Sequence, residues 1–336
     1  ARSLGEPLSS RFSIQPGERF LWTLCGDAKR KIVLASSFGY GFVTELGNLH
    51  GRMKAGKAML TVPAGAVPVA PALVDTDGEE GLVGVQIFGA DPDHMAEAAR
   101  LLGEHRMDVL DINFGCSVRK ILKTGSGSAL MKAPALAQEL LTAVRKAIRI
   151  PLTIKIRSGW DDASINYTEI ARIASEEGVD AVTQHPRTRA QMFGGQAEWQ
   201  QIKVLKQALT IPVIGSGDLF DAAGIKTMFA ETGCDAVMVG RGGYGNPWII
   251  SQALDLLAGR AIQEPTSEDR LNTAREHFNL CLQIFGPRKT LGQMRKHLCW
   301  YARGMDNAAG FRAEINQTRT VDEMNRRLED FFANAE

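Results

Sequence analysis

The sequence has 336 residues, of which 44% are hydrophobic and 23% charged, and its formal net charge at pH 7 is +1. This length and composition are typical of a globular protein with one large and one small domain, and a net charge near zero argues against a strongly basic nucleic-acid binder. Five widely spaced cysteines show neither a disulfide framework nor metal-ligand spacing, which favours a reducing cytoplasm. No run reaches the roughly 18 apolar residues of a membrane helix. We therefore expect a cytoplasmic protein without a metal, and a monomer.

The predicted strands begin with "GFVTEL" at 41–46, together with a further strand near 11–15 or 31–35. From residue 82 onward, short runs rich in Val and Ile alternate with amphipathic stretches, as buried parallel strands alternate with helices. The runs are "LVGVQIFG", "MDVLDINFG", "IPLTIKIRSG", "VDAVTQHPR", "IPVIGSGD" and "CDAVMVGRG", and the amphipathic stretches cover 92–104, 133–149, 167–178, 198–209 and 221–233. This regular repeat predicts an α/β fold, a (β/α)8 TIM barrel, in preference to an open doubly wound sheet.

After "GNPWII" the strand signals stop, and residues 250–336 have the pattern of helices with a break at Gly310. We predict two domains, a barrel at 1–251 and a small helical domain at 252–336.

Polar residues follow the predicted strands, at the barrel edge where this fold places its active site. They are Glu45, Gln86, Asn113, Cys116, Lys155, Arg157, His185, Arg187, Ser216, Gly217, Asp218, Gly240 and Arg241. A single such residue is commonly structural, but their recurrence across six strands indicates a site.

The last two predicted strands end in "GSGD" and "GRGG", where small residues let backbone amides approach an anion. These positions are the frequent phosphate site of the fold and indicate a phosphorylated ligand. Lys155 and Arg157 add positive charge, which would stabilise the reduced, anionic form of a bound flavin.

Positive charge is concentrated in two windows. Residues 117–159 contain nine Lys and Arg against one acidic residue, a net charge of +8, and residues 286–319 contain seven against two, a net charge of +5. Together they favour an acidic partner over two basic helix faces that only contact solvent.

The segments "VQIFG", "DINFGC", "GSGSALM", "IKIRSGW", "HPRTR", "IPVIGSGD" and "DAVMVGRGGYGNPW", in this order and spacing, resemble the bacterial tRNA-dihydrouridine synthases. The resemblance covers about 80–336 and is closest to the subgroup linked to nitrogen regulation. It implies an FMN-dependent barrel that reduces uridine in tRNA to 5,6-dihydrouridine with NADPH, and a helical domain that binds the tRNA.

The resemblance also assigns roles. Cys116 matches the family's catalytic cysteine and would donate a proton to uracil C5, while hydride passes from flavin N5 to C6. The matching cofactor residues are Gln86, Asn113, Lys155, His185, Arg187, Ser216, Gly217, Asp218, Gly240 and Arg241. For the tRNA we predict contacts from Asn113, Arg119, Lys120, Arg187, Arg295 and Lys296.

The sequence departs from the family's pattern at several positions. Phe12 to Ile14 replace the turn after the first strand, and Ser117 replaces the proline after the cysteine. Pro186 and Ser216 also differ from the usual residues. The altered first strand and Ser117 motivate one alternative, a flavin- or RNA-binding regulatory protein with weakened catalysis. Another alternative is an FMN barrel that acts on free pyrimidines, which the chain resembles around Asn113, Cys116 and Lys155.

Overall fold

The computed structural model describes Lys29, residues 31–35, 41–45, Leu49, 72–74, 81–103 and 107–333. Within these residues six strands form one sheet in the order β4-β5-β6-β7-β8-β9. The strands are β4 (Gly84–Ile87), β5 (Val109–Asn113), β6 (Leu152–Arg157), β7 (Ala181–His185), β8 (Val213–Ser216) and β9 (Ala236–Met238). β4 pairs with β5, β5 with β6 and β8 with β9, each time in parallel. The predicted α/β class, a parallel barrel-type sheet with helices between its strands and further helices at the C-terminus, is confirmed.

A separate three-stranded sheet contains β1 (Lys31–Ala35), β2 (Gly41–Glu45) and β3 (Ala72–Val74) in the order β2-β1-β3, and β1 is antiparallel to both neighbours. The prediction that 41–46 is a parallel barrel strand is therefore wrong, and so is the alternative at 31–35. Only residues 36–40 connect β1 to β2, and a parallel pair needs a crossover of a dozen or more residues. The alternative at 11–15 lies outside the described residues.

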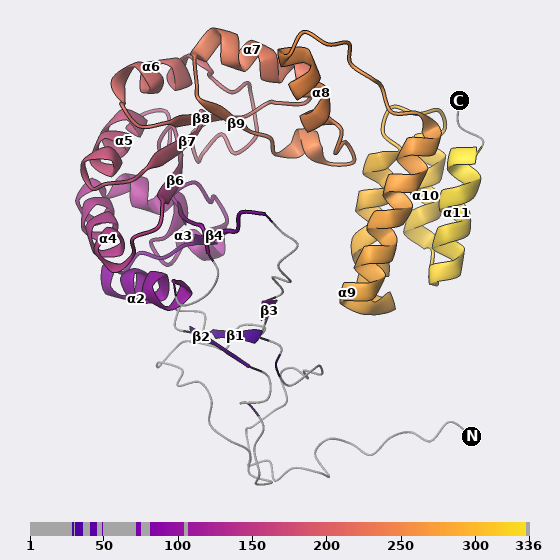
Figure 1. Cartoon of the computed structure of the whole chain (residues 1–336), viewed down its shortest axis with the longest axis horizontal. Coiled ribbons are helices and arrows are strands. Elements are labelled where there is room, and N and C mark those ends of the chain that lie inside the picture. Colours follow the sequence, from indigo (N-terminus) through magenta and orange to yellow (C-terminus); the bar gives the residue numbers. More distant parts are fainter. Residues whose placement is uncertain are drawn as a thin grey trace. The chain divides into compact units, whose positions relative to one another are not determined.

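The chain forms two compact units, Ala1–Thr183 with Arg187–Gly194 and Gln184–Pro186 with Gly195–Glu336. In the first unit, α2 (Pro92–Leu102), α4 (Pro134–Ala147) and α5 (Tyr167–Glu176) lie on one side of β4 to β6 (Figure 1). Leu110, Ile112, Leu152 and Ile154 are fully buried, whereas the residues between them on each strand are partly exposed. Because strand side chains alternate between faces, one face of the sheet is apolar and the other polar.

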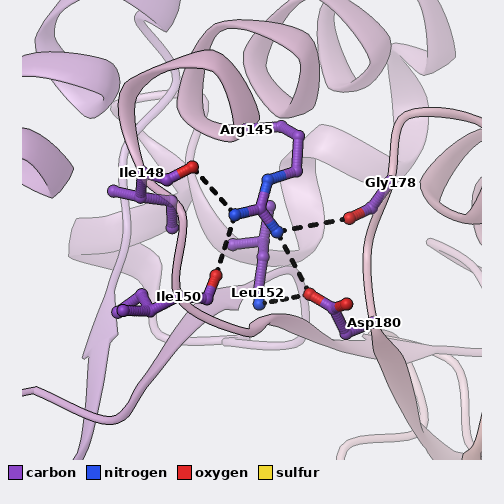
Figure 2. A network of polar contacts seen from close by, with 6 residues as sticks. All are labelled: Arg145, Ile148, Ile150, Leu152, Gly178 and Asp180. Carbon is purple, nitrogen blue, oxygen red and sulfur yellow. Dashed lines mark hydrogen bonds and ion pairs between the residues drawn. The ribbon is translucent and has the colours of Figure 1, made fainter.

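Arg145, in the last turn of α4, joins that helix to the start of β6 (Figure 2). Its guanidinium donates to the carbonyl oxygens of Ile148 and Ile150 at 2.9 and 2.8 Å, and it pairs with the Asp180 carboxylate at 3.1 Å. Asp180 also accepts from the Leu152 backbone amide at 2.8 Å. The guanidinium therefore stabilises the turn between helix and strand. The count of basic residues in 117–159, which suggested an acidic partner, did not predict this structural role.

The second unit continues the alternation with α6 (Gln200–Ala208), α7 (Ala222–Thr232) and α8 (Ile249–Leu257). Asp221 caps α7 by accepting from the Gly224 amide at 2.7 Å, and Gly233 ends the helix in the left-handed conformation with φ of 67°. α8 packs against α7. The predicted domain boundary at 251 falls within α8, and the division into a barrel and a tRNA-binding domain stays a prediction.

Three C-terminal helices pack together, α9 (Ser267–Tyr301), α10 (Ala308–Gln317) and α11 (Val321–Ala333) (Figure 1). Their core includes Phe278, Met294, Phe311 and Leu328, each no more than 2% exposed. The predicted break at Gly310 is wrong, because Gly310 lies inside α10 next to the Asn307 side chain. The helix breaks lie instead at the Gly286–Pro287 pair in α9 and at Gly304, both glycines with positive φ.

Candidate active site

The polar face of the first unit carries a row of side chains across three strands. Gln86 on β4 lies opposite Asp111 on β5, and Asp111 lies opposite Thr153 on β6. The Asp111 carboxylate accepts from Gln86 Nε2 at 2.6 Å and from Thr153 Oγ1 at 2.7 Å. Asn113 and Lys155 form the next pair toward the C-terminal ends of the strands, and Asn113 Nδ2 donates to Gln86 Oε1 at 2.8 Å.

The loop after β5, residues 114–118, carries the half-buried free thiol of Cys116, and we name it the thiol loop. Asn113 Oδ1 accepts from the backbone amides of Gly115 and Cys116 at 3.0 and 2.8 Å. On the other side, the Cys116 carbonyl oxygen accepts from the Ser128 amide at 3.1 Å and from its hydroxyl at 2.8 Å. Gly127 has a φ of 65°, and a Cβ there would lie 2.9 Å from the same carbonyl oxygen. The backbone of Cys116 is therefore held from both sides at the strand end.

Lys155 places an ammonium group on this polar face. Its pKa is lowered from 10.5 to about 8, mainly by burial and then by the charge of Arg157, while the Asp111 carboxylate opposes the shift. In the part of the chain that the structure describes, no hydrogen bond or ion pair holds the Lys155 Nζ atom. A desolvated cation without a close partner is suited to bind an electron-rich or anionic ligand.

Two arginines are buried in the first unit, and one of them, Arg157, contacts the thiol loop. Arg157 is 4% exposed, and its Nε donates to the Gly115 carbonyl oxygen at 2.9 Å, while its Nη1 donates to the carbonyl oxygens of Thr188 and Met192 at 3.0 Å each. Arg187 is 2% exposed and donates to the Gly194 carbonyl oxygen at 3.0 Å. Burial, and then the Arg187 charge, lower the pKa of Arg157. These cations give this part of the site a positive potential.

The second unit contains the other predicted cofactor residues. His185 and Ser216 are buried at the ends of β7 and β8, and Gly217 follows with a φ of 111°. A Cβ on Gly217 would lie 2.9 Å from His185 Cδ2, so only glycine allows this approach.

Asp218 and Arg241 connect the turns that follow β8 and β9. Arg241 pairs with the Asp218 carboxylate at 3.1 Å, and the carboxylate also accepts from the Ala197 amide at 2.9 Å. Gly240 lies in open space, since a Cβ there would meet no atom within 4 Å. The two predicted phosphate turns are therefore joined by an ion pair, and Gly240 leaves room for a ligand.

The predicted RNA contacts differ in exposure. Arg119 and Lys120 are exposed on the short helix α3 (Arg119–Leu122) beside the thiol loop, and Lys296 is exposed on α9. Arg295 is only partly exposed, and its Nη2 donates to the Thr318 carbonyl oxygen at 2.7 Å, which joins α9 to the end of α10. Arg119, Lys120 and Lys296 are therefore available to a partner, while Arg295 has a structural contact.

The structure brings Gln86, Asn113, Cys116, Lys155 and Arg187 together in the first unit, and His185, Ser216, Gly217, Asp218, Gly240 and Arg241 in the second. Sequence reasoning missed Asp111, Thr153 and Ser128. The signal for Asp111 was present, because it precedes Asn113 by two residues and therefore shares its strand face. Among the described residues, no helix is long and apolar enough to cross a membrane, and no three His, Cys, Asp or Glu side chains could hold a metal ion.

Comparisons with known proteins agree with this arrangement. The model of the family "Dihydrouridine synthase (Dus)" matches residues 58–336. The chain is 39% identical over 255 residues to tRNA-dihydrouridine synthase B of Pasteurella multocida, which covers 76% of this chain and 77% of that protein. It is 38% identical over 260 residues to tRNA-dihydrouridine synthase B of Xanthomonas axonopodis, which covers 77% of this chain and 78% of that protein.

Among solved structures, a D-glucarate dehydratase from Agrobacterium tumefaciens aligns with a TM-score of 0.40 and 16% identity, covering 55% of this chain and 47% of that one, a likeness too low to inform fold or function. The family model matches most of the sequence, and the relatives are similar over more than two thirds of their own length. The chain belongs to the dihydrouridine synthase family.

Proposed function

We propose that the protein is a tRNA-dihydrouridine synthase, which reduces specific uridines in tRNA to 5,6-dihydrouridine. The observation that carries this proposal is the thiol of Cys116, held at a strand end of a chain that belongs to the dihydrouridine synthase family. Relatives that are 38 to 39% identical to this chain over the aligned residues are named tRNA-dihydrouridine synthases, which supports tRNA as the substrate.

We propose FMN as the cofactor and NADPH as its reductant. The glycine turns after β8 and β9 suit the phosphate of a flavin, and the Lys155 ammonium group, which has no close partner among the described residues, suits its electron-rich ring. Gln86, Asn113, Lys155 and Arg187 would bind the ring and its chain, and His185, Ser216, Gly217, Asp218, Gly240 and Arg241 would bind toward the phosphate. When bound, FMN supplies the hydride that adds to uracil C6.

Cys116 supplies the proton in this proposal. Addition of a hydride at C6 and a proton at C5 saturates the 5,6 double bond, and the thiolate then recovers a proton from water. A protonated thiol can act as a general acid. The Asn113 side chain, fixed by Gln86 and by two backbone amides, would orient the uracil beside the thiol.

The target base must leave its stack to reach Cys116, so the protein has to bind a distorted RNA. Arg119 and Lys120 are exposed next to the thiol loop, and Lys296 is exposed on the helical region. We propose that these cations contact phosphates, and that residues 252–336 form the tRNA-binding domain and 1–251 the catalytic domain. Cytoplasmic localisation and a monomeric state stay predictions.

Deletion of the gene tests the proposal in the cell. We expect mass spectrometry of the purified tRNA to show one or more positions that change from dihydrouridine to uridine, and a plasmid copy of the gene to restore them. An unchanged dihydrouridine content in a strain that contains no second enzyme of this family would contradict the proposal.

A further inference from the structure

The Asp111 carboxylate lies one row below Asn113 on the polar face and has no role in the proposed chemistry. Both of its oxygens accept hydrogen bonds, Oδ1 from Thr153 Oγ1 at 2.7 Å and Oδ2 from Gln86 Nε2 at 2.6 Å. Gln86 in turn bonds to Asn113, and Asn113 bonds to the thiol loop. We name this series, from Thr153 through Asp111, Gln86 and Asn113 to the amides of Gly115 and Cys116, the polar chain.

The direction of the polar chain, by which we mean the donor-to-acceptor order of its hydrogen bonds, is set at its Asp111 end. An ionised carboxylate only accepts hydrogen bonds, so the Gln86 amide has to turn its nitrogen toward Asp111. The Gln86 oxygen then faces Asn113, whose nitrogen donates to it at 2.8 Å. The Asn113 oxygen is consequently left free to accept on its other side.

The other end of the polar chain requires the same direction. The backbone amides of Gly115 and Cys116 only donate, and they lie 3.0 and 2.8 Å from Asn113 Oδ1. If the Asn113 amide were reversed, its NH2 group would face two N–H donors, and both backbone amides would lose their acceptor. The carboxylate at one end and the amides at the other therefore allow one orientation of each side-chain amide between them.

We propose that Asp111 is a positioning residue, which fixes the orientation of the Gln86 and Asn113 amides and thereby holds the thiol loop in place. Asp111 acts through these two side chains and does not contact Cys116. The inference deepens the proposed function and rests on it only in the last step, in which the held thiol is the proton donor.

Three neighbours of Asp111 favour its ionised form, which only accepts hydrogen bonds, although the net shift of its pKa is upward. Burial raises the pKa of Asp111, and the hydrogen bonds from Thr153 and Gln86, together with the Lys155 charge, oppose that rise. The same three neighbours thus favour the ionised form that the polar chain requires.

Two substitutions with the same branching separate the hydrogen bonds from the shape of the side chain. In Asp111→Asn the new oxygen can still accept from Gln86, and the new NH2 group can donate to the Thr153 hydroxyl, so the polar chain keeps its direction. In Asp111→Leu no acceptor remains, so the Gln86 amide loses the bond that orients it, and Asn113 is held only by its bonds to the Gly115 and Cys116 amides.

The test is hydrogen exchange of backbone amides in the purified full-length chain, followed by NMR. In Asp111→Leu we expect the Gly115 and Cys116 amides to exchange about fivefold faster, since loss of one hydrogen bond is worth roughly 1 kcal/mol. The amides of α4 should be unchanged, and Asp111→Asn should keep the wild-type rates. With tRNA as substrate, Asp111→Leu should lower kcat and leave KM unchanged.

An Asn113→Ala background provides the control. If Asp111 acts through Asn113, adding Asp111→Leu to Asn113→Ala should produce no further change at the two amides. Gln86→Met breaks the same polar chain at its next link and serves as the test if Asp111→Leu does not fold. The inference is overturned if Gly115 and Cys116 exchange at wild-type rates in the folded variant, or if Asp111→Asn accelerates them as much as Asp111→Leu.

The exchange measurement needs neither tRNA nor flavin, so it remains valid if the proposed function is wrong. Faster exchange in Asp111→Leu, combined with a wild-type protein that forms no dihydrouridine, would support the positioning role and reject the proposed function.

Discussion

Arg157 Nε donates a hydrogen bond to the Gly115 carbonyl oxygen at 2.9 Å and so joins the end of β6 to the thiol loop. The same guanidinium donates to Thr188 and Met192 in the loop after β7. One buried cation therefore connects two strand-end loops, and its five N–H groups in a planar fork are what make three such bonds possible.

We predict that Arg157→Met lowers the free energy of unfolding by about 2–3 kcal/mol, because three carbonyl acceptors lose their donor in a buried place. Arg157→Lys should recover only part of this loss, since an ammonium group cannot reproduce the fork. Urea unfolding followed by circular dichroism measures both.

Arg172→Ala is the matched control for Arg157. Arg172 pairs with Glu176 on the exposed face of α5, and its removal should cost less than about 0.5 kcal/mol. Equal losses for Arg157→Met and Arg172→Ala would contradict a connecting role for Arg157.

The Lys155 ammonium should reduce stability at neutral pH. Its pKa of about 8 lies below the 10.5 of an ordinary lysine, so the folded chain binds fewer protons than the unfolded chain between these values, and stability rises with pH across that window. We predict that Lys155→Met is more stable than the wild type by about 1–3 kcal/mol near pH 7, and that this advantage narrows as the pH rises above 8.

Denaturant unfolding at several pH values checks the Lys155 prediction, and flavin titration of the same variant should show weaker binding. A Lys155→Met protein that is less stable than the wild type at neutral pH would show that the ammonium group has a stabilising partner.

Gly217 should not tolerate a side chain. Its φ of 111° is strained for any other residue, and a Cβ would lie 2.9 Å from His185 and 3.0 Å from the Ala197 Cβ atom. We predict that Gly217→Ala costs about 1–3 kcal/mol of stability and weakens FMN binding. Gly243→Ala, in the turn after β9, is the control, because its Cβ would make only an ordinary contact at 3.9 Å. Thermal unfolding of the two variants should differ by several degrees, and the prediction fails if they melt together.

Arg295 and Lys296 are adjacent in sequence but should behave differently. Arg295→Ala should lower stability by about 1–2 kcal/mol, because the Thr318 carbonyl oxygen loses its donor. Lys296→Ala should leave stability unchanged. It should also reduce the slope of the logarithm of the tRNA binding constant against the logarithm of the salt concentration by about one, because one phosphate contact is lost. Filter binding at several salt concentrations, with unfolding curves on the same samples, tests the pair. Weaker tRNA binding in Arg295→Ala alone would reverse these roles.

Much of the fold could be predicted from hydrophobic periodicity, because the six parallel strands and the helices between them each bury a regular face. The strand at 41–45 was also recognisable, but its partner was not, since periodicity identifies a strand and not the sheet to which it belongs. The helix break at Gly286 was missed, although the Gly-Pro pair is a known break signal.

Prediction of the site was less complete, for a similar reason. Polar residues directly after strands were easy to identify, whereas Asp111 lies inside β5 and becomes informative only through its neighbours Gln86 and Thr153 on other strands. Charge counting had a comparable limit, because Arg145 contributes to the basic window but bonds to its own turn. Hydrogen-bond partners far apart in sequence are set by the register of the sheet, which one sequence does not reveal.

The central claim is that Cys116 donates the proton in the reduction of uridine in tRNA. The most direct measurement incubates the purified protein with FMN, NADPH and tRNA that lacks dihydrouridine, and then quantifies dihydrouridine by mass spectrometry, for the wild type and for Cys116→Ala. We predict that the wild type forms dihydrouridine, and that Cys116→Ala forms little or none although NADPH still reduces its flavin. Turnover by Cys116→Ala at the wild-type rate, or a flavin-loaded wild type that forms no dihydrouridine, would contradict the claim.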